Sequence, residues 1–244
     1  MEIEEIEAKK KDITFRDTKW FGFQGTFYRN KVELEALKNF RIDHSDLVLD
    51  VGAGSGRITK EIAKSGAEII ALDYSVESLK TNKTNSDAQV VAADMCYLPF
   101  RSSFFSKVVA LSVLQLIPTP KSRLEALEEV KRVLKPGSRF LMETYNYRPL
   151  YDGLIKRRKE GYYRTAPPVY YYRFNYNELM DILLSVFTKV SEFRAILILN
   201  PLMQGTLGNI KILAKLAASL EKILGKTRLS FLFADHLLAI CKKL

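Results

Sequence analysis

Short apolar runs alternate along the chain with longer segments in which apolar residues recur every three to four positions. A short run that is apolar throughout predicts a strand buried on both faces, and the wider spacing predicts an amphipathic helix. The predicted strands lie at 47–51, 68–72, 89–92, 107–112, 189–199 and 231–242, with a further one entered through 134–142, and the predicted helices at 31–40, 58–66, 75–80, 123–134, 177–187 and 204–226. At 244 residues, this alternation suits one α/β domain with an elaboration.

The first predicted strand leads directly into a glycine-rich turn. Leu47–Val51 is followed by Gly52, Gly54 and Gly56 at alternate positions, and a helical pattern resumes at Ile58. Such a turn presents free backbone N–H groups at a helix N-terminus, beside a surface that carries no side chains. We therefore expect a ligand to lie directly on the main chain here.

Three kinds of glycine turn compete for this segment. A phosphate-binding P-loop needs Lys and then Ser or Thr after its last glycine, but Arg57 and Ile58 follow here. A dinucleotide fingerprint spaces its glycines G-x-G-x-x-G, and the third glycine comes one position early. The pattern G-x-G-x-G with Asp50 two residues before it resembles motif I of class I S-adenosylmethionine (SAM)-dependent methyltransferases. A bare Rossmann-like crossover also carries a glycine turn, so the neighbouring segments decide.

An acidic residue ends the second predicted strand. Asp73 lies 21 positions after Gly52, where a carboxylate in such a crossover accepts hydrogen bonds from the two ribose hydroxyls. Tyr74 follows and is expected to pack on the adenine face. The alternative is that Asp73 only caps the next helix, a role that Ser75 fills equally well.

Two further segments carry the same resemblance. Asp94-Met95, with Leu98-Pro99-Phe100 after it, resembles the adenine-binding loop of that family, in which the acid accepts from the adenine amino group. Residues 132–142, RVLKPGSRFLM, resemble the RVLKPGG segment of methyltransferase type 11, the ubiquinone-biosynthesis-like family, with Ser138 at the second glycine. Five elements thus match one family in order and spacing between about residues 46 and 143.

The resemblance implies a complete architecture and a cofactor. The fold is α/β, with a Rossmann-like, seven-stranded, mostly parallel sheet, helices on both faces, an antiparallel last strand and a cap made by insertions. The implied cofactor is SAM, and the implied reaction is methyl transfer by in-line displacement. The residues expected at the cofactor are Asp50, Gly52, Ala53, Gly54, Gly56, Asp73, Tyr74, Asp94, Met95, Leu111, Ser112, Tyr28 and Arg29.

The catalytic residues depart from the family pattern. Many relatives carry a His-containing pair where this chain has Gln115-Leu116, and the histidines of this chain are His44 and His236. A glutamine can orient an acceptor but takes no proton at neutral pH. The candidates are therefore Gln115 as an orienting group and Tyr28 as an assisting one. Alignment of the reactants alone can account for about 7–11 kcal/mol of the barrier, so no base is required.

The core is expected at about 40–144 and 177–244 of a single domain that spans 1–244. Residues 1–39 are expected to form a lid, with an aromatic patch that begins at Trp20, although core packing is the favoured role for most of that patch.

Two insertions complete the chain. Residues 145–176 hold nine of the twelve tyrosines and the basic run Lys156–Lys159. We expect this segment to form a cap that contacts substrate; the alternative is a structural lid with a solvated basic run. Residues 204–226 predict an amphipathic helix, with leucines on one side and lysines towards the other. We expect its apolar side (Leu213, Leu216, Leu220 and Ile223 or Leu224) to pack onto the cap, and weak contact with a membrane surface is the alternative.

Composition limits the partners. The net charge of +10 suggests nucleic acid, an acidic lipid surface or an acidic metabolite, although a solvated basic surface explains the charge equally well. No apolar run approaches the length that spans a bilayer, and the N-terminus has no signal-peptide core. Cys96 and Cys241 lie far apart and have no metal-site partners in the sequence. We expect a cytoplasmic protein with reduced thiols and no bound metal.

The sequence therefore predicts a SAM-dependent methyltransferase that acts on a small molecule, apolar, aromatic or lipid-like, with an anionic group. Motifs for methylation of exocyclic base amines or of pyrimidine C5 are absent. Two other functions stay open at this point, an RNA methyltransferase and a non-catalytic SAM-binding module. A nicotinamide oxidoreductase is disfavoured by the early third glycine and by Asp94-Met95.

Overall fold

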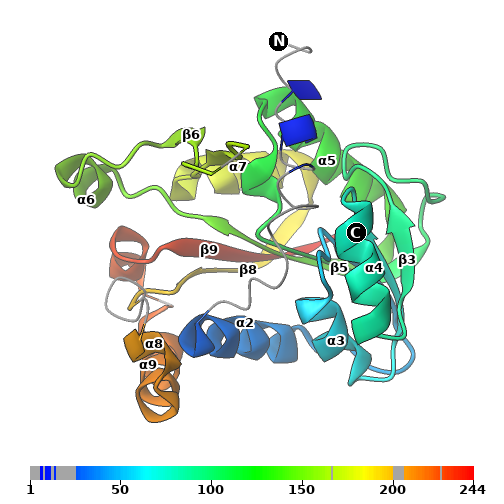
Figure 1. Cartoon of the computed structure of the whole chain (residues 1–244), viewed down its shortest axis with the longest axis horizontal. Coiled ribbons are helices and arrows are strands. Elements are labelled where there is room, and N and C mark those ends of the chain that lie inside the picture. The colour runs from blue at the N-terminus through cyan, green and yellow to red at the C-terminus, as the bar shows by residue number, and fades with distance from the viewer. Residues whose placement is uncertain are drawn as a thin grey trace.

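The computed structural model describes residues 6–7, 9–11, 14, 26–165, 167–199, 206–225 and 227–244. It contains a seven-stranded sheet with the strand order β3-β2-β1-β4-β5-β9-β8 (Figure 1). Its strands are β1 (Leu47–Val51), β2 (Glu68–Asp73), β3 (Gln89–Ala92), β4 (Phe105–Leu111), β5 (Leu134–Tyr145), β8 (Lys189–Ile196) and β9 (His236–Lys242).

The sheet is mostly parallel, as predicted. The strands β1 to β5 pair in parallel, and β9 pairs antiparallel with both β5 and β8. The chain order 3-2-1-4-5 places the carboxyl ends of β1 and β4 next to each other at a change of winding direction. Open α/β sheets bind ligands in the crevice at such a point.

Helices cover both faces of the sheet. The described helices are α2 (Phe27–Phe40), α3 (Arg57–Ala63), α4 (Val76–Asn85), α5 (Pro120–Val133), α6 (Pro149–Leu154), α7 (Tyr176–Val186), α8 (Thr206–Asn209) and α9 (Lys211–Leu224), with 3₁₀ turns at η1 (Leu114–Leu116) and η2 (Arg228–Leu232). One apolar core joins the sheet to α2, α3 and α9, and the other joins it to α5 and α7 (Figure 1).

Local capping explains where two helices begin earlier than their apolar spacing predicts. The hydroxyl of Thr26 accepts a hydrogen bond from the Arg29 backbone N–H, so α2 begins at Phe27. Thr119 caps α5 in the same way, and Pro120 occupies its first helical position, where a missing N–H costs nothing. The last strand begins at His236, because η2 takes up the start of the segment predicted as strand.

The cap between β5 and α7 contains α6 and a small antiparallel pair, β6 (Glu160–Tyr162) and β7 (Tyr170–Tyr172). Its chain crosses over the carboxyl end of β5: the backbone N–H of Tyr147 donates to the carbonyl of Phe174, and that of Phe174 donates to the carbonyl of Tyr145. The predicted cap therefore lies at the edge of the sheet where the glycine turn also lies.

The second insertion packs differently from the prediction. The helix α9 contacts α2 through Ala214, Ala217 and Ala218, which are buried, whereas its leucines are exposed. The expectation that the leucines pack onto the cap is wrong, because the small alanines allow the two helices to approach closely. Among the described residues, no helix is long and apolar enough to cross a membrane.

Candidate functional site

The glycine turn after β1 adopts backbone conformations that side chains disfavour. Gly52, Gly54 and Gly56 have φ values of 67°, 53° and 92°. A Cβ atom on Gly52 would lie 2.4 Å from Val113 Cγ2, and one on Gly56 would lie 2.8 Å from Asn82 Oδ1. The turn therefore fits tightly against its neighbours on two sides. A Cβ atom on Gly54 would meet nothing within 4 Å, so the third side is open.

Asp73, at the end of β2, holds this turn. Its Oδ2 accepts a hydrogen bond of 2.9 Å from the Gly54 N–H, and its Oδ1 accepts one of 2.9 Å from the Ser75 N–H. The cap of α4 is Ser75, whose hydroxyl accepts from the Ser78 N–H. Because Ser75 already caps α4, Asp73 is not needed as its cap. Each carboxylate oxygen of Asp73 can still accept a further hydrogen bond from a ligand.

Asp50 lies under the turn and is almost completely buried. Its Oδ2 accepts a 2.6 Å hydrogen bond from the Thr59 hydroxyl. Burial raises the pKa of Asp50 to about 7, against the opposing effects of Thr59 and Arg57. A carboxyl group of this kind gains most when a ligand brings a positive charge to it.

A cavity of about 330 Å³ opens in front of the turn. Seven of the residues predicted at the cofactor and the candidate Gln115 line it together with residues from the cap. From the prediction these are Arg29, Asp50, Gly52, Ala53, Gly54, Leu111, Ser112 and Gln115, and from the cap Tyr145, Tyr163, Thr165 and Val169.

A smaller cavity of about 40 Å³ lies beside the first and shares Gly52, Ser112 and Leu116 with it. Its walls hold the residues predicted at the adenosine, namely Asp73, Tyr74, Asp94 and Met95. Lys9 also lines this cavity, and its Nζ lies 2.8 Å from Asp94 Oδ2. Although burial alone raises it, the pKa of Asp94 is held below its ordinary value by Lys9 and by the Cys96 N–H. No local pattern in the sequence indicates this contact.

Charged side chains of α2 form a buried network beside the larger cavity, whose lining includes Arg29 and Arg57. Glu33 receives Arg29 Nε at 2.6 Å and Arg57 Nη1 at 2.5 Å. Although burial alone raises the pKa of Glu33, the two guanidinium groups hold it below its ordinary value. Arg29 also donates through Nη2 to the Ser112 hydroxyl at 2.7 Å. The lid residue Arg29 is therefore fixed in place by α2 and by the end of β4.

A second buried network begins at Ser112, whose φ is 61°. Its hydroxyl donates to Glu143 Oε2 at 2.7 Å, and Glu143 Oε1 contacts His236 Nδ1. Burial lowers the pKa of His236 well below its ordinary value, with a further contribution from Arg29, so the imidazole is neutral. Sequence reasoning missed Glu143. A charged residue inside an apolar strand is the signal that could have found it.

Gln115 is completely buried in η1 and lines the larger cavity. Its Oε1 accepts a 3.1 Å hydrogen bond from the Thr144 hydroxyl. Among the described residues, its Nε2 has no hydrogen-bond partner. An unpaired buried donor is costly, and this one becomes useful when a ligand supplies an acceptor.

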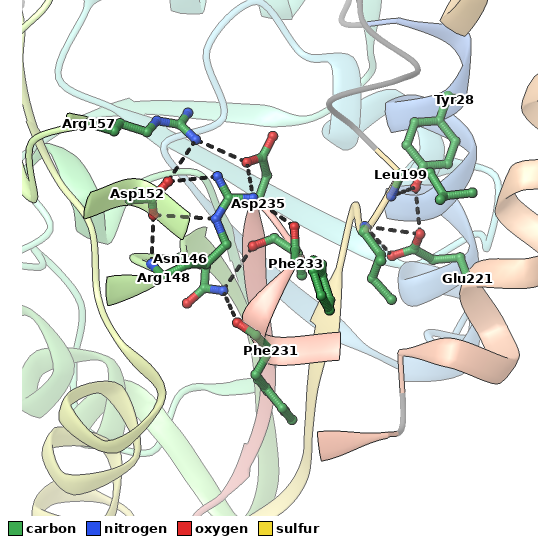
Figure 2. Close-up of polar contacts among 12 residues, drawn as sticks. Tyr28, Asn146, Arg148, Asp152, Arg157, Leu199, Glu221, Phe231, Phe233 and Asp235 are labelled. Carbon is green, nitrogen blue, oxygen red and sulfur yellow. Dashed lines mark hydrogen bonds and ion pairs between the residues drawn. The ribbon is translucent and has the colours of Figure 1, made fainter. Parts of the chain in front are cut away.

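The other catalytic candidate, Tyr28, is not brought to either cavity. Its hydroxyl donates to Glu221 Oε2 on α9 at 2.5 Å and accepts from the Leu199 N–H at 3.3 Å (Figure 2). Burial, with Glu221 next, raises the pKa of Tyr28 far above its ordinary value. The structure therefore gives Tyr28 a structural position between α2 and α9 rather than a place at the cofactor. The aromatic residues Trp20, Phe21 and Phe23 of the same predicted patch lie outside the described residues.

The cap tyrosines divide into two groups. Tyr145 and Tyr163 line the larger cavity, and burial together with Tyr145 raises the pKa of Tyr163 above its ordinary value. Others serve the cap itself: Tyr170 donates to Glu160 and Tyr172 donates to Glu178. Some cap tyrosines therefore line the cavity and others hold the cap together, and contact of the cap with a substrate stays a prediction.

The basic run of the cap is partly bound within the protein. Arg157 Nη1 lies 3.1 Å from Asp235, beside a buried pair in which Arg148 Nη2 lies 2.8 Å from Asp152 (Figure 2). Lys159 Nζ lies 2.9 Å from Glu178. Arg157 and Lys159 are therefore neither free for a substrate nor simply solvated, because each is paired with an acid of the same chain. The sequence alone does not show which acids the fold brings to them. Lys156 and Arg158 are exposed.

Comparisons with known proteins give the site a family context. Residues 49–142 match the family model described as a methyltransferase domain. The chain is 35% identical over 101 residues to a demethylmenaquinone methyltransferase from Renibacterium salmoninarum, and the aligned segment covers 41% of this chain and 41% of the relative. It is 32% identical over 124 residues to one from Corynebacterium urealyticum, covering 51% of this chain and 52% of the relative. The match thus spans about half the length of these curated relatives or somewhat less.

Solved structures match over most of the chain. A SAM-dependent methyltransferase from Methanosarcina mazei has a TM-score of 0.60 at 21% identity, covering 85% of this chain and 96% of its own. A 1,6-didemethyltoxoflavin-N1-methyltransferase from Burkholderia thailandensis, solved with that compound and S-adenosylhomocysteine, has a TM-score of 0.63 at 16% identity, covering 99% of this chain and 89% of its own. The resemblance inferred from the sequence and the seven-stranded fold are confirmed.

Proposed function

We propose that this chain, as a single domain, binds SAM across the two cavities and transfers its methyl group to a small apolar or aromatic acceptor held beneath the cap. The observation that carries the proposal is the wall of the larger cavity. This wall combines the glycine turn and Asp50 with Gln115, Tyr145 and Tyr163. A cofactor on the glycine turn and an acceptor under the cap would therefore occupy one continuous space.

The residues present suit SAM. The open side of Gly54 lets a ligand lie against main chain, and the buried carboxyl of Asp50 suits the cationic amino acid end. The oxygens of Asp73 suit vicinal hydroxyl groups, and Asp94 suits an amino group once Lys9 moves aside. The larger cavity lies at the glycine turn, and the smaller one, which Lys9 also lines, lies at the residues predicted for the adenosine.

When bound, SAM supplies an electrophilic methyl group on a sulfonium. The chain supplies alignment. The Nε2 of Gln115 can donate to an acceptor oxygen or nitrogen, and the side chains around it are fixed: Thr144 holds the amide, and Arg29 and Glu143 hold Ser112. Such positioning can account for about 7–11 kcal/mol of the barrier. Tyr163 also lines this cavity, and burial together with its contact with Tyr145 raises its pKa, so its hydroxyl stays protonated.

The lining favours an aromatic acceptor with a polar atom. Tyr145, Tyr163, Leu116 and Val169 make a mainly apolar wall, and Gln115 provides the polar point. The relatives with about one third identity are named demethylmenaquinone methyltransferases, which supports a quinone-like ring as the acceptor class. RNA is disfavoured, because Arg157 and Lys159 of the basic run are engaged with acids of the same chain.

Methyl transfer from labelled SAM tests this proposal. A demethylmenaquinol with a short side chain is the probe, and a transfer RNA mixture is the comparison. We expect labelled product from the quinol, lost mostly in Gln115→Ala, with label absent from the RNA. Label in a defined RNA, or no transfer to the quinol by protein that binds SAM, would contradict the acceptor class.

A further inference from the structure

The helix α9 presents two different apolar faces. One is buried against α2 and consists of Ala214, Ala217 and Ala218, with Glu221 beside them. The opposite face carries the large side chains, and these are exposed: Ile212 at 72%, Leu216 at 59%, Leu220 at 51% and Ile223 at 71%. Single exposed leucines are ordinary, but a continuous apolar face on one helix indicates an interaction surface.

The rotation of α9 that exposes this face is fixed by buried polar contacts. Glu221 Oε2 accepts from the Tyr28 hydroxyl, and Glu221 Oε1 accepts from the Ile198 N–H at 3.1 Å (Figure 2). Turning the helix to bury its leucines would break these bonds and bring bulky side chains against α2. The exposed face is therefore a stable feature of the fold.

Positive charge borders the apolar face. Lys211, Lys215 and Lys222 are exposed, and at 100° per residue they form one stripe along α9, with Ser219 between that stripe and the leucines. Lys222 lies 3.0 Å from Glu35 of α2, whereas the one acid of α9 itself, Glu221, is buried on the other side. The combination of a broad apolar face and a lysine stripe is typical of helices that lie in the interface of an anionic bilayer.

We propose that α9 docks the protein on an anionic lipid surface, with Ile212, Leu216, Leu220 and Ile223 inserted among the acyl chains and the lysines at the headgroups. A lipid surface fits better than a second copy of the chain, because it supplies apolar depth and negative charge together. The net charge of +10 adds long-range attraction to such a surface. This proposal does not depend on the acceptor or on methyl transfer.

Sedimentation with vesicles tests the proposal directly. The probes are vesicles of phosphatidylcholine alone and vesicles of an equal mixture of phosphatidylcholine and phosphatidylglycerol. We expect the wild-type protein to sediment with the mixed vesicles and release at high salt. The double variant Leu216→Glu/Leu220→Glu should bind the mixed vesicles at least roughly tenfold more weakly than the wild type, since both apolar contacts are lost. Lys211→Gln/Lys215→Gln should weaken binding by roughly fivefold per lysine.

The matched control is Leu184→Glu on α7, which replaces another half-exposed leucine away from this face. It should bind the mixed vesicles as the wild type does. Failure of the wild type to sediment with them would overturn the proposal, and so would equal binding by the double variant. A wild-type dimer in solution that becomes a monomer in the double variant, without vesicle binding, would assign the face to a second copy instead.

Discussion

Thr144 and Gln115 are joined by a 3.1 Å hydrogen bond from the threonine hydroxyl to Oε1 of the amide. This bond occupies one end of the Gln115 side chain and leaves Nε2 without a partner in the described structure, in a residue that lines the larger cavity. A strand and a 3₁₀ turn thus fix a donor at the place where an acceptor would lie.

Replacing Gln115 should lower the rate without changing its pH dependence. Gln115→Ala removes a donor worth about 1–3 kcal/mol, so kcat should fall roughly tenfold to hundredfold. Because an amide does not titrate, the pH–rate profile should keep its shape between about pH 6 and 9. Thr144→Val is the companion variant and should give a smaller loss with the same profile. A steep pH step in the wild type that vanishes in Gln115→Ala would show that this position moves a proton.

Asp50 should make SAM affinity depend on pH. Its pKa of about 7 means that the free protein holds a proton there at lower pH, whereas a cationic ligand favours the ionised form. Affinity should therefore rise with pH up to about 7 and then level off, changing by about tenfold per pH unit on the acid side. Calorimetric titration from about pH 5.5 to 8.5 measures this. The matched variant Asp50→Asn should show weaker, pH-independent binding, and an unchanged pH dependence in that variant would contradict the assignment.

Lys9 should compete with the cofactor. Its contact with Asp94 occupies the carboxylate that an adenine amino group would use. A partly exposed pair of this kind contributes about 0.2–1 kcal/mol, so Lys9→Ala should tighten SAM binding by up to roughly fivefold. Lys10→Ala is the control on the neighbouring residue and should have no effect. Weaker binding in Lys9→Ala would instead make Lys9 part of a closing lid.

Tyr28 should matter for stability and not for the cofactor. Tyr28→Phe leaves the buried carboxyl of Glu221 without its shortest partner, which costs about 1–3 kcal/mol. For a chain of this size the midpoint of thermal unfolding should fall by about 2–4 °C per kcal/mol. SAM affinity should stay within twofold or so of the wild type. A large loss of SAM affinity with an unchanged unfolding midpoint would show that Tyr28 acts at the cofactor site.

Two neighbouring arginines of the cap provide a matched pair. Arg157 joins the buried acids Asp152 and Asp235, whereas Arg158 is exposed. Arg157→Ser should destabilise the protein by about 1–3 kcal/mol, because it removes a partner from partly buried charges. Arg158→Ser should change the free energy of unfolding by less than about 0.5 kcal/mol. Chemical denaturation compares the two, and equal effects would mean that the ion pairs add nothing.

The sheet was predictable because its strands are short, apolar and bounded by turn residues. Leu47–Val51 and Gln89–Ala92 have the bounds that their patterns indicate, and the glycine turn lies where the spacing places it. Helix starts were less predictable, since Thr26 and Thr119 cap helices that begin several residues before the predicted starts at residues 31 and 123.

Contacts between distant segments were outside the reach of the sequence. The pattern of α9 offers both an alanine face and a leucine face for packing, and only the presence of α2 with Tyr28 selects the alanines. Glu143 and His236 meet because β5 and β9 are neighbours, which no local pattern shows. The partners of Arg157 and Lys9 are unpredictable for the same reason.

We propose that the glycine turn, Asp73 and Asp94 together hold SAM. Calorimetric titration of the wild-type protein with S-adenosylhomocysteine and, separately, with NADH tests it most directly. We expect saturable binding of S-adenosylhomocysteine at one site, weakened at least roughly tenfold by Gly54→Val, whose side chain would fill the open side of the turn. NADH should give no binding heat. Saturable binding of NADH with no heat from S-adenosylhomocysteine would show that the glycine turn does not hold SAM.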